Sequence, residues 1–188
     1  MTIFHVLSCV KRLVFTPYHR WLKSSLKSCG TDVFFGGWLR ISDPGKVELG
    51  DRVSIGNNAF ISSEGGLSVG DNTRIAPNVV IYTYNHNCVG DLLPHDEKLL
   101  LKPVRIGRNV WIGSNVKLVP GVTVGDGAVV GMGTVVTGDV PPLAVVGNQR
   151  MRVINHRDEK HYNELDNAHR YMWTDSNPGG KWKHVNQE

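Results

Sequence analysis

The pattern of hydrophobic and polar positions repeats every six residues over most of the chain. From Val47 the hexads read VELGDR, VSIGNN and AFISSE, then LSVGDN, TRIAPN and VVIYTY, and after residue 103 they run from VRIGRN to TVVTGD. The third residue of all twelve hexads is aliphatic, the first is usually Val, and turn-forming residues fill the last positions. Repeats of constant length indicate a solenoid, in which each repeat buries its apolar face against its neighbours.

The spacing within a hexad favours a short strand followed by a bend. Two apolar residues are separated by one polar residue, so both face inward while the polar residue faces out. The Gly, Asp and Asn residues that follow permit a sharp corner. Three hexads make a triangular coil of eighteen residues. We therefore predict an all-β chain folded as a parallel β-helix; a β-sandwich would need hairpin turns and variable strand spacing.

The repeat is interrupted twice, and each interruption predicts a feature. Leu67 begins its hexad two residues late, so Gly65–Gly66 predicts a small bulge at one corner. Between Ile81 and Val104 the chain has 22 residues without a hexad. A segment of this length inside a compact domain is usually functional. We predict a catalytic loop over residues 82–103 that projects from one corner.

The two ends differ from the repeat region, which gives three parts: an amphipathic arm over 1–30, the β-helix over 31–154, and a polar helix and tail over 155–188. Residues 1–30 carry five Lys or Arg and no acidic residue, whereas the whole chain has a net charge of +4. The arm therefore holds +5 and the remainder −1. Two interpretations stay open: a helix packed on the domain or on a neighbouring subunit, and a basic segment resting on an anionic membrane.

Composition excludes several classes of protein. Basic residues gathered in the arm argue against a nucleic-acid binder, which would spread them over its main body. No apolar run reaches the roughly 18 residues that span a bilayer, and the first residues do not resemble a signal peptide. Cys9, Cys29 and Cys88 lie far apart, which favours free thiols in a reducing compartment. We expect a cytoplasmic protein.

Residues 67–153 resemble the hexapeptide-repeat acyltransferases, in the branch of maltose, galactoside and bacterial polysaccharide O-acetyltransferases. The resemblance rests on "IAPNVVIYTYNHN", a long loop, and "IGRNVWIGSNVKLVPGVTVGDGAVVGMGTVVTGDVPP". It implies a left-handed β-helix with short helical appendages, acetyl-CoA as the acyl donor, and a homotrimer with active sites between subunits. A zinc-dependent carbonic anhydrase of this fold needs three histidine ligands, and only His86 and His95 fall in the repeat region, so we predict no metal site.

By this resemblance His86, at the start of the long loop, is the catalytic base. A sugar hydroxyl is a poor nucleophile at neutral pH, and an imidazole can remove its proton during attack on a thioester. His95, in the same loop, is interpreted as a loop residue without a role in the chemistry. Neighbouring polar residues are candidates for binding the substrate or stabilising the imidazolium, and spacing does not choose among them: Asn85, Asn87, Asp91 and Glu97.

Trp111 occupies an outward position on its hexad, which is unusual for a tryptophan left in water. Two interpretations are compatible: a trimer-interface residue, and part of the active-site cleft, where it would contact both acceptor and thioester. Gly138 stands where the family commonly has Lys, and nearby arginines are candidates for the missing charge. The remaining cofactor residues that the resemblance implies are Ser114, Met132, Thr137, Arg150 and Arg152.

These features predict an acetyl-CoA-dependent O-acetyltransferase that acts on a sugar hydroxyl. The maltose and galactoside branch opens with an acidic helical region resembling "MLAGELYD", which this chain lacks. Its basic arm instead favours surface polysaccharide biosynthesis (capsule, exopolysaccharide or lipopolysaccharide), with a lipid-linked or nucleotide-linked acceptor at a membrane. Two alternatives stay open: N-acetylation of a nucleotide-linked amino sugar, and a non-catalytic β-helix that serves as an assembly module.

Overall fold

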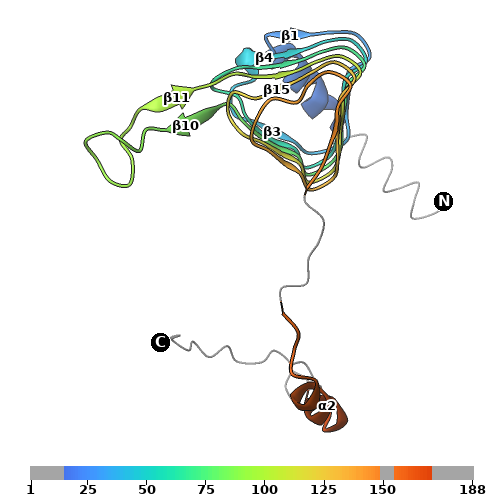
Figure 1. Ribbon diagram of the computed structural model, residues 1–188. Helices are drawn as coiled ribbons and strands as arrows, with labels where there is room; N and C mark the ends of the chain where they lie inside the picture. The colour runs from blue at the N-terminus through green and yellow to red at the C-terminus, as the bar shows by residue number, and fades with distance from the viewer. Residues whose placement is uncertain (1–14, 149–154, 171–188) are drawn as a thin grey trace, which may run out of the picture. The chain divides into compact units, whose positions relative to one another are not determined.

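The computed structural model describes residues 15–148 and 155–170 and confirms the predicted parallel β-helix. The chain winds through three parallel sheets in a solenoid of about six turns, and Figure 1 shows the triangular outline of the coils. The first sheet contains β1 (Ser28–Cys29), β4 (Val47–Leu49), β7 (Leu67–Val69), β12 (Val104–Ile106) and β15 (Thr123–Val124). The second contains β2 (Phe34–Phe35), β5 (Ser54–Ile55), β8 (Arg74–Ile75), β13 (Trp111–Ile112), β16 (Val129–Val130) and β18 (Val145–Val146). The third contains β3 (Arg40–Ile41), β6 (Phe60–Ser62), β9 (Val80–Tyr82), β14 (Lys117–Leu118) and β17 (Val135–Val136).

Stacked aliphatic residues form the core of the solenoid. In the second sheet Ile55 pairs with Ile75, which pairs with Ile112, which pairs with Val130. All four side chains are at most 2% exposed. Burying one such side chain contributes about 1.5–3 kcal/mol, so the in-phase column of third hexad positions supplies much of the stability.

The coils differ in length. Register partners lie 20 residues apart in the early coils, as for Val47 and Leu67, and 37 apart across the long insertion, as for Leu67 and Val104. The spacing is 18 after the insertion, as for Arg105 and Thr123, and 16 at the end, as for Val129 and Val145. The early coils include the 3-10 turn η1 (Pro44–Lys46) in one case and the Gly65–Gly66 bulge in the other. The solenoid begins at Ser28, ahead of the first regular hexad at Val47. Ser28 pairs with Glu48, so the residues between them form a complete first coil of 20 residues.

Corners are built from residues that accept a left-handed backbone. Asn58, Asn78 and Asn115 have φ near +60°, a region that asparagine enters more readily than most residues. Equivalent asparagines stack: Asn58 Nδ2 donates to Asn78 Oδ1 at 2.9 Å. These side-chain ladders run along the outside of the coil and tie successive turns together.

Helical segments lie at both ends of the described chain. Residues 15–25 are helical, and buried Leu22 in this helix and buried Leu26 directly after it pack into the core of the solenoid. Helix α2 (Glu159–Asn167) belongs to a separate compact unit, residues 150–188, and none of its residues is buried. Within the described part of the chain, no helix is long and apolar enough to cross a membrane. Cys29 and Cys88 are free thiols, and Cys9 lies outside the described residues.

Candidate functional site

The long interruption of the repeat is a β-hairpin. After β9 the chain leaves the corner between the third and first sheets as β10 (Tyr84–His86), and it returns as β11 (Leu99–Leu101) (Figure 1). The strands are antiparallel, with Asn85 opposite Leu100 and His86 opposite Leu99. The segment expected to be a loop therefore has a regular root, and residues 87–98 form its tip.

The hairpin root is fixed to the solenoid through Thr83. The hydroxyl of this buried residue donates to the Ser62 carbonyl at 2.8 Å and accepts from the Gly65 N–H at 2.7 Å. A Cβ at position 65 would lie 1.9 Å from the Thr83 carbonyl oxygen, so only glycine fits there. The predicted bulge and the hairpin are thus parts of one structure, and the bulge makes room for the hairpin to leave.

His86 is the last residue of β10 and is exposed. Its ring stacks on His95, with centroids 4.0 Å apart and planes 18° apart, and meets the ring of Tyr84 edge-on at 5.8 Å. Its backbone N–H donates to Oδ1 of Asn85 at 3.0 Å. The imidazole is therefore held by aromatic neighbours while it remains open to a substrate.

Asp96 organises the hairpin tip. This carboxylate is 5% exposed, accepts from Asn87 Nδ2 at 2.7 Å and from the Lys98 N–H at 2.9 Å, and lies 3.9 Å from Lys98 Nζ. A Cβ at Gly90 would lie 2.0 Å from its Oδ2. The Asp96 carbonyl oxygen accepts a hydrogen bond from His95 Nδ1 at 2.9 Å, so Nδ1 carries the proton. This bond fixes the orientation of the His95 ring that stacks on His86.

Sequence reasoning overlooked Asp96 and considered its neighbours instead. Asp91 and Glu97 are both exposed, and among the described residues neither forms an ion pair or a side-chain hydrogen bond. Spacing alone gave no reason to prefer Asp96, because its burial depends on how the tip folds back on Asn87. His95, interpreted from the sequence as a loop residue without a role in the chemistry, stacks directly on His86.

Three of the predicted cofactor residues gather around the corner between the second and third sheets. Trp111 is outward on β13 and 61% exposed, Ser114 follows that strand, and Met132 follows the neighbouring strand β16. The Gly133 N–H donates to the Ser114 carbonyl at 2.8 Å. Exposed Thr137 follows β17 at the next corner, between the third and first sheets. Arg150 and Arg152 lie outside the described residues.

One chain does not bring the two groups of predicted site residues together. His86 and Asn85 project from the corner between the third and first sheets, whereas Trp111 faces out from the second sheet, on the opposite side of the triangle. The interior between them is filled by the aliphatic core. A site that uses both His86 and Trp111 therefore needs a second copy of the chain.

Family comparisons match the repeats directly. Residues 103–138 match the model described as bacterial transferase hexapeptide (six repeats), and residues 46–83 match the hexapeptide repeat of succinyl-transferase. A solved maltose O-acetyltransferase from Clostridium difficile is 33% identical, with 75% of each chain covered and a TM-score of 0.66. The chain belongs to the hexapeptide-repeat acetyltransferases. As a member of that family it is an acyltransferase, not a non-catalytic assembly module.

Two further hexapeptide-repeat acetyltransferase structures were solved with their cofactor. One, from Vibrio cholerae, is complexed with acetyl coenzyme A; it is 25% identical, with 76% of this chain and 78% of that chain covered and a TM-score of 0.62. A galactoside acetyltransferase in complex with coenzyme A is 29% identical, with 88% of this chain and 77% of that chain covered and a TM-score of 0.60. No curated protein sequence matches the chain.

Among the described residues, no group of three or more His, Cys, Asp or Glu side chains is arranged to hold a metal ion.

Proposed function

We propose that the protein transfers an acetyl group from acetyl-CoA to a hydroxyl of a sugar, with His86 as the general base. The observation that carries the proposal is the exposed imidazole of His86, held against His95 at the end of a firmly rooted hairpin strand. Similarity to maltose and galactoside acetyltransferases supports the sugar acceptor, and the relatives solved with CoA or acetyl-CoA support the donor.

The chemistry follows from the properties of the imidazole. His86 takes the proton from the sugar hydroxyl as the hydroxyl oxygen attacks the thioester carbonyl carbon. The new C–O bond forms, the C–S bond breaks, and the departing thiolate receives a proton to give CoA. No acyl-enzyme is needed, because donor and acceptor are bound together and the reaction becomes effectively unimolecular.

We infer further that the active form is a homotrimer whose sites lie between subunits. Closed cyclic assemblies are common among oligomers of identical chains, and they let one copy's hairpin lie against the outward face of the next. Exposed Trp111 and the exposed hairpin residues Leu99, Leu100 and Leu101 are apolar surfaces that such an assembly would cover. Asn85 and Asp91 then bind the acceptor beside His86, while Trp111, Ser114, Met132 and Thr137 contact the donor.

Thiol release from acetyl-CoA tests the proposed function. The full chain should release CoA thiol rapidly when a suitable sugar is present and slowly without it. A panel of free, nucleotide-linked and lipid-linked sugars then identifies the acceptor. Thiol release that no sugar accelerates would argue against a sugar acetyltransferase.

His95 is expected to position His86. Replacing His95 with alanine removes the stacking partner, so kcat should fall about tenfold while KM for acetyl-CoA stays unchanged. His95→Phe keeps a flat ring in the same place and should restore most of the rate. If the Phe variant is as slow as the Ala variant, or if KM for acetyl-CoA rises in both, stacking does not position the base.

We also propose that the enzyme works in surface polysaccharide assembly, at the inner face of a membrane. Support comes from the helical end of the arm, where Trp21 is 58% exposed beside Arg20, and from the first coil, where Phe34 and Trp38 are 63% and 55% exposed. Aromatic rings beside basic residues suit an anionic lipid surface.

Vesicle flotation tests the membrane contact. The full chain should float with vesicles that contain anionic phosphatidylglycerol and should stay behind with neutral vesicles. The double variant Arg20→Gln, Trp21→Ser should bind severalfold more weakly, because each basic residue near the surface contributes about 1 kcal/mol. Equal flotation of wild type and variant, or no flotation at all, would contradict this contact.

A further inference from the structure

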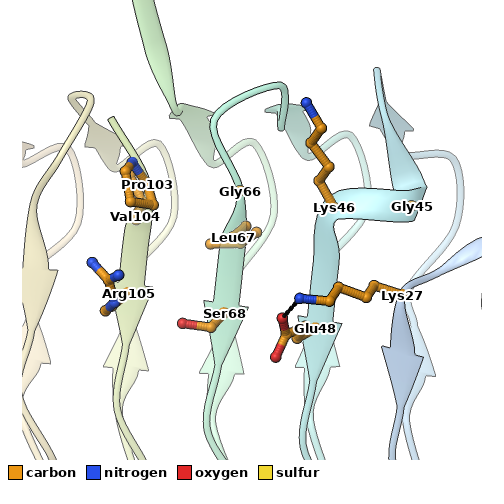
Figure 2. A pocket seen from close by; sticks show the side chains of 10 residues that line it. All are labelled: Lys27, Gly45, Lys46, Glu48, Gly66, Leu67, Ser68, Pro103, Val104 and Arg105. Carbon is orange, nitrogen blue, oxygen red and sulfur yellow. Dashed lines mark hydrogen bonds and ion pairs between the residues drawn. The ribbon is translucent and has the colours of Figure 1, made fainter. Parts of the chain in front are cut away.

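A groove of about 450 Å³ lies on the outward face of the first sheet, beside the hairpin root (Figure 2). Its floor contains the strand residues Leu67 and Val104, which are themselves buried in the core. A Cβ added at Gly66 would meet no atom closer than 3.8 Å, so the space beside this residue is open. The polar residues around it come from four separate segments of the chain.

The groove has an excess of positive charge. Lys27, Lys46 and Arg105 line it with one carboxylate, Glu48, and a second carboxylate, Asp43, pairs with Lys46, so three cations against two anions leave a charge of +1. Glu48 is already neutralised, because Lys27 Nζ lies 2.5 Å from its Oε1. Lys46 Nζ donates to the Glu64 carbonyl at 2.8 Å and lies 3.7 Å from Asp43 Oδ2.

Arg105 is the cation without a partner. Its exposed guanidinium forms no hydrogen bond or ion pair with any residue in the part of the chain that the structure describes. Glu48, Ser68 and Arg105 form one row of register partners on neighbouring strands. Strands in a sheet are about 4.8 Å apart, so Glu48 lies two strands, or about 10 Å, from Arg105 and the two do not pair. The Ser68 hydroxyl stands between them (Figure 2).

These groups match the chemistry of a phosphate. A guanidinium binds two phosphate oxygens through parallel N–H donors, and an adjacent hydroxyl and ammonium groups supply further donors. Such charge-assisted hydrogen bonds are stronger than neutral ones, and the pair of Glu48 with Lys27 leaves the added anion little repulsion to overcome. An uncharged sugar could accept single hydrogen bonds from the guanidinium, but it would lack the charge-assisted bidentate contact that a phosphate makes.

We propose that this groove binds a phosphate or diphosphate group of the acceptor, so that the sugar is recognised through its phosphate linkage. The inference rests on the proposed function and names the class of its acceptor. From Arg105 to Leu99, the register partner of His86, the chain spans at most about 20 Å of extended strand. One elongated acceptor with a phosphate in the groove can therefore present a hydroxyl to the hairpin.

Calorimetric titration of the full chain with inorganic pyrophosphate at low salt tests the groove directly. Wild type is expected to bind, Arg105→Gln to bind about tenfold more weakly, and added salt to weaken both. The matched control is Arg40→Gln, which removes an outward arginine from the third sheet and should leave the affinity unchanged. No binding to wild type, or equal losses in the two variants, overturns the proposal.

Competition identifies the source of the phosphate. A nucleoside-diphosphate sugar or a short-chain prenyl-diphosphate sugar that displaces pyrophosphate supports the proposal and shows which linkage the enzyme uses. If neither displaces it, or if CoA displaces it and Arg105→Gln weakens CoA binding, the groove does not serve the acceptor. These titrations involve no turnover, so their failure is distinct from a failure of acetyl transfer.

Discussion

His86→Ala should lower kcat for acetyl transfer about 10²–10⁴-fold, which is the range that a general base contributes. The exposed ring makes no contact with the solenoid core, so the variant should keep the melting temperature and circular dichroism of the wild type. Binding of acetyl-CoA should also survive, since the residues proposed to contact the donor lie elsewhere on the chain. The measurement is initial rate of thiol release at saturating acetyl-CoA.

His156→Ala is the matched control for this prediction. His156 is exposed and lies in the separate C-terminal unit, so its removal should leave the rate unchanged. Equal activity of His86→Ala and wild type would mean that another group removes the proton. Loss of activity in both variants would point to a general effect of losing a surface histidine.

Mixing two inactive variants should restore activity. His86→Ala lacks the base, and Trp111→Ala lacks the outward ring on the second sheet; the two residues lie on opposite sides of one chain. If each site combines His86 of one subunit with Trp111 of the next, a mixed trimer contains some sites with both residues intact. Each mixed trimer then has one of its three sites repaired, so about a third of the sites in the purified mixed assemblies should be active.

The complementation experiment uses co-expression with two affinity tags, so that only mixed assemblies are purified. Each variant assembled alone supplies the background rate. A mixed preparation whose rate equals the average of the two backgrounds would show that each chain builds its own site. When the double variant, with both changes in one chain, is mixed with wild type, about a sixth of the sites in the purified mixed assemblies should be intact by the same argument.

The regular part of the fold was predictable because one residue type at one spacing determines it. The third position of every hexad is aliphatic, and these residues form the core of the structure, in which Ile81 and Ile112 are fully buried. The early coil from Ser28 was harder to recognise, because its two extra residues put its apolar positions out of phase with later hexads.

The chemistry of the hairpin was less predictable than its location. A break in the repeat marked residues 82–103, but strand pairing between Asn85 and Leu100 joins residues with no shared pattern. The burial of Asp96 and the stacking of His95 depend on how the tip folds back on itself. Single-sequence reasoning orders residues along the chain, whereas these contacts join residues nine positions apart, as for Asn87 and Asp96, or fifteen apart, as for Asn85 and Leu100.

Mass spectrometry of the sugar product tests the central claim most directly. After incubation of the wild-type enzyme with acetyl-CoA and the acceptor found in the thiol-release panel, the sugar should gain one acetyl group. Brief treatment with alkaline hydroxylamine should remove that group, because it cleaves an ester and spares an amide. The same incubation with His86→Ala should give almost no product. A hydroxylamine-resistant acetyl group, or equal product from the two proteins, would contradict O-acetyl transfer by His86.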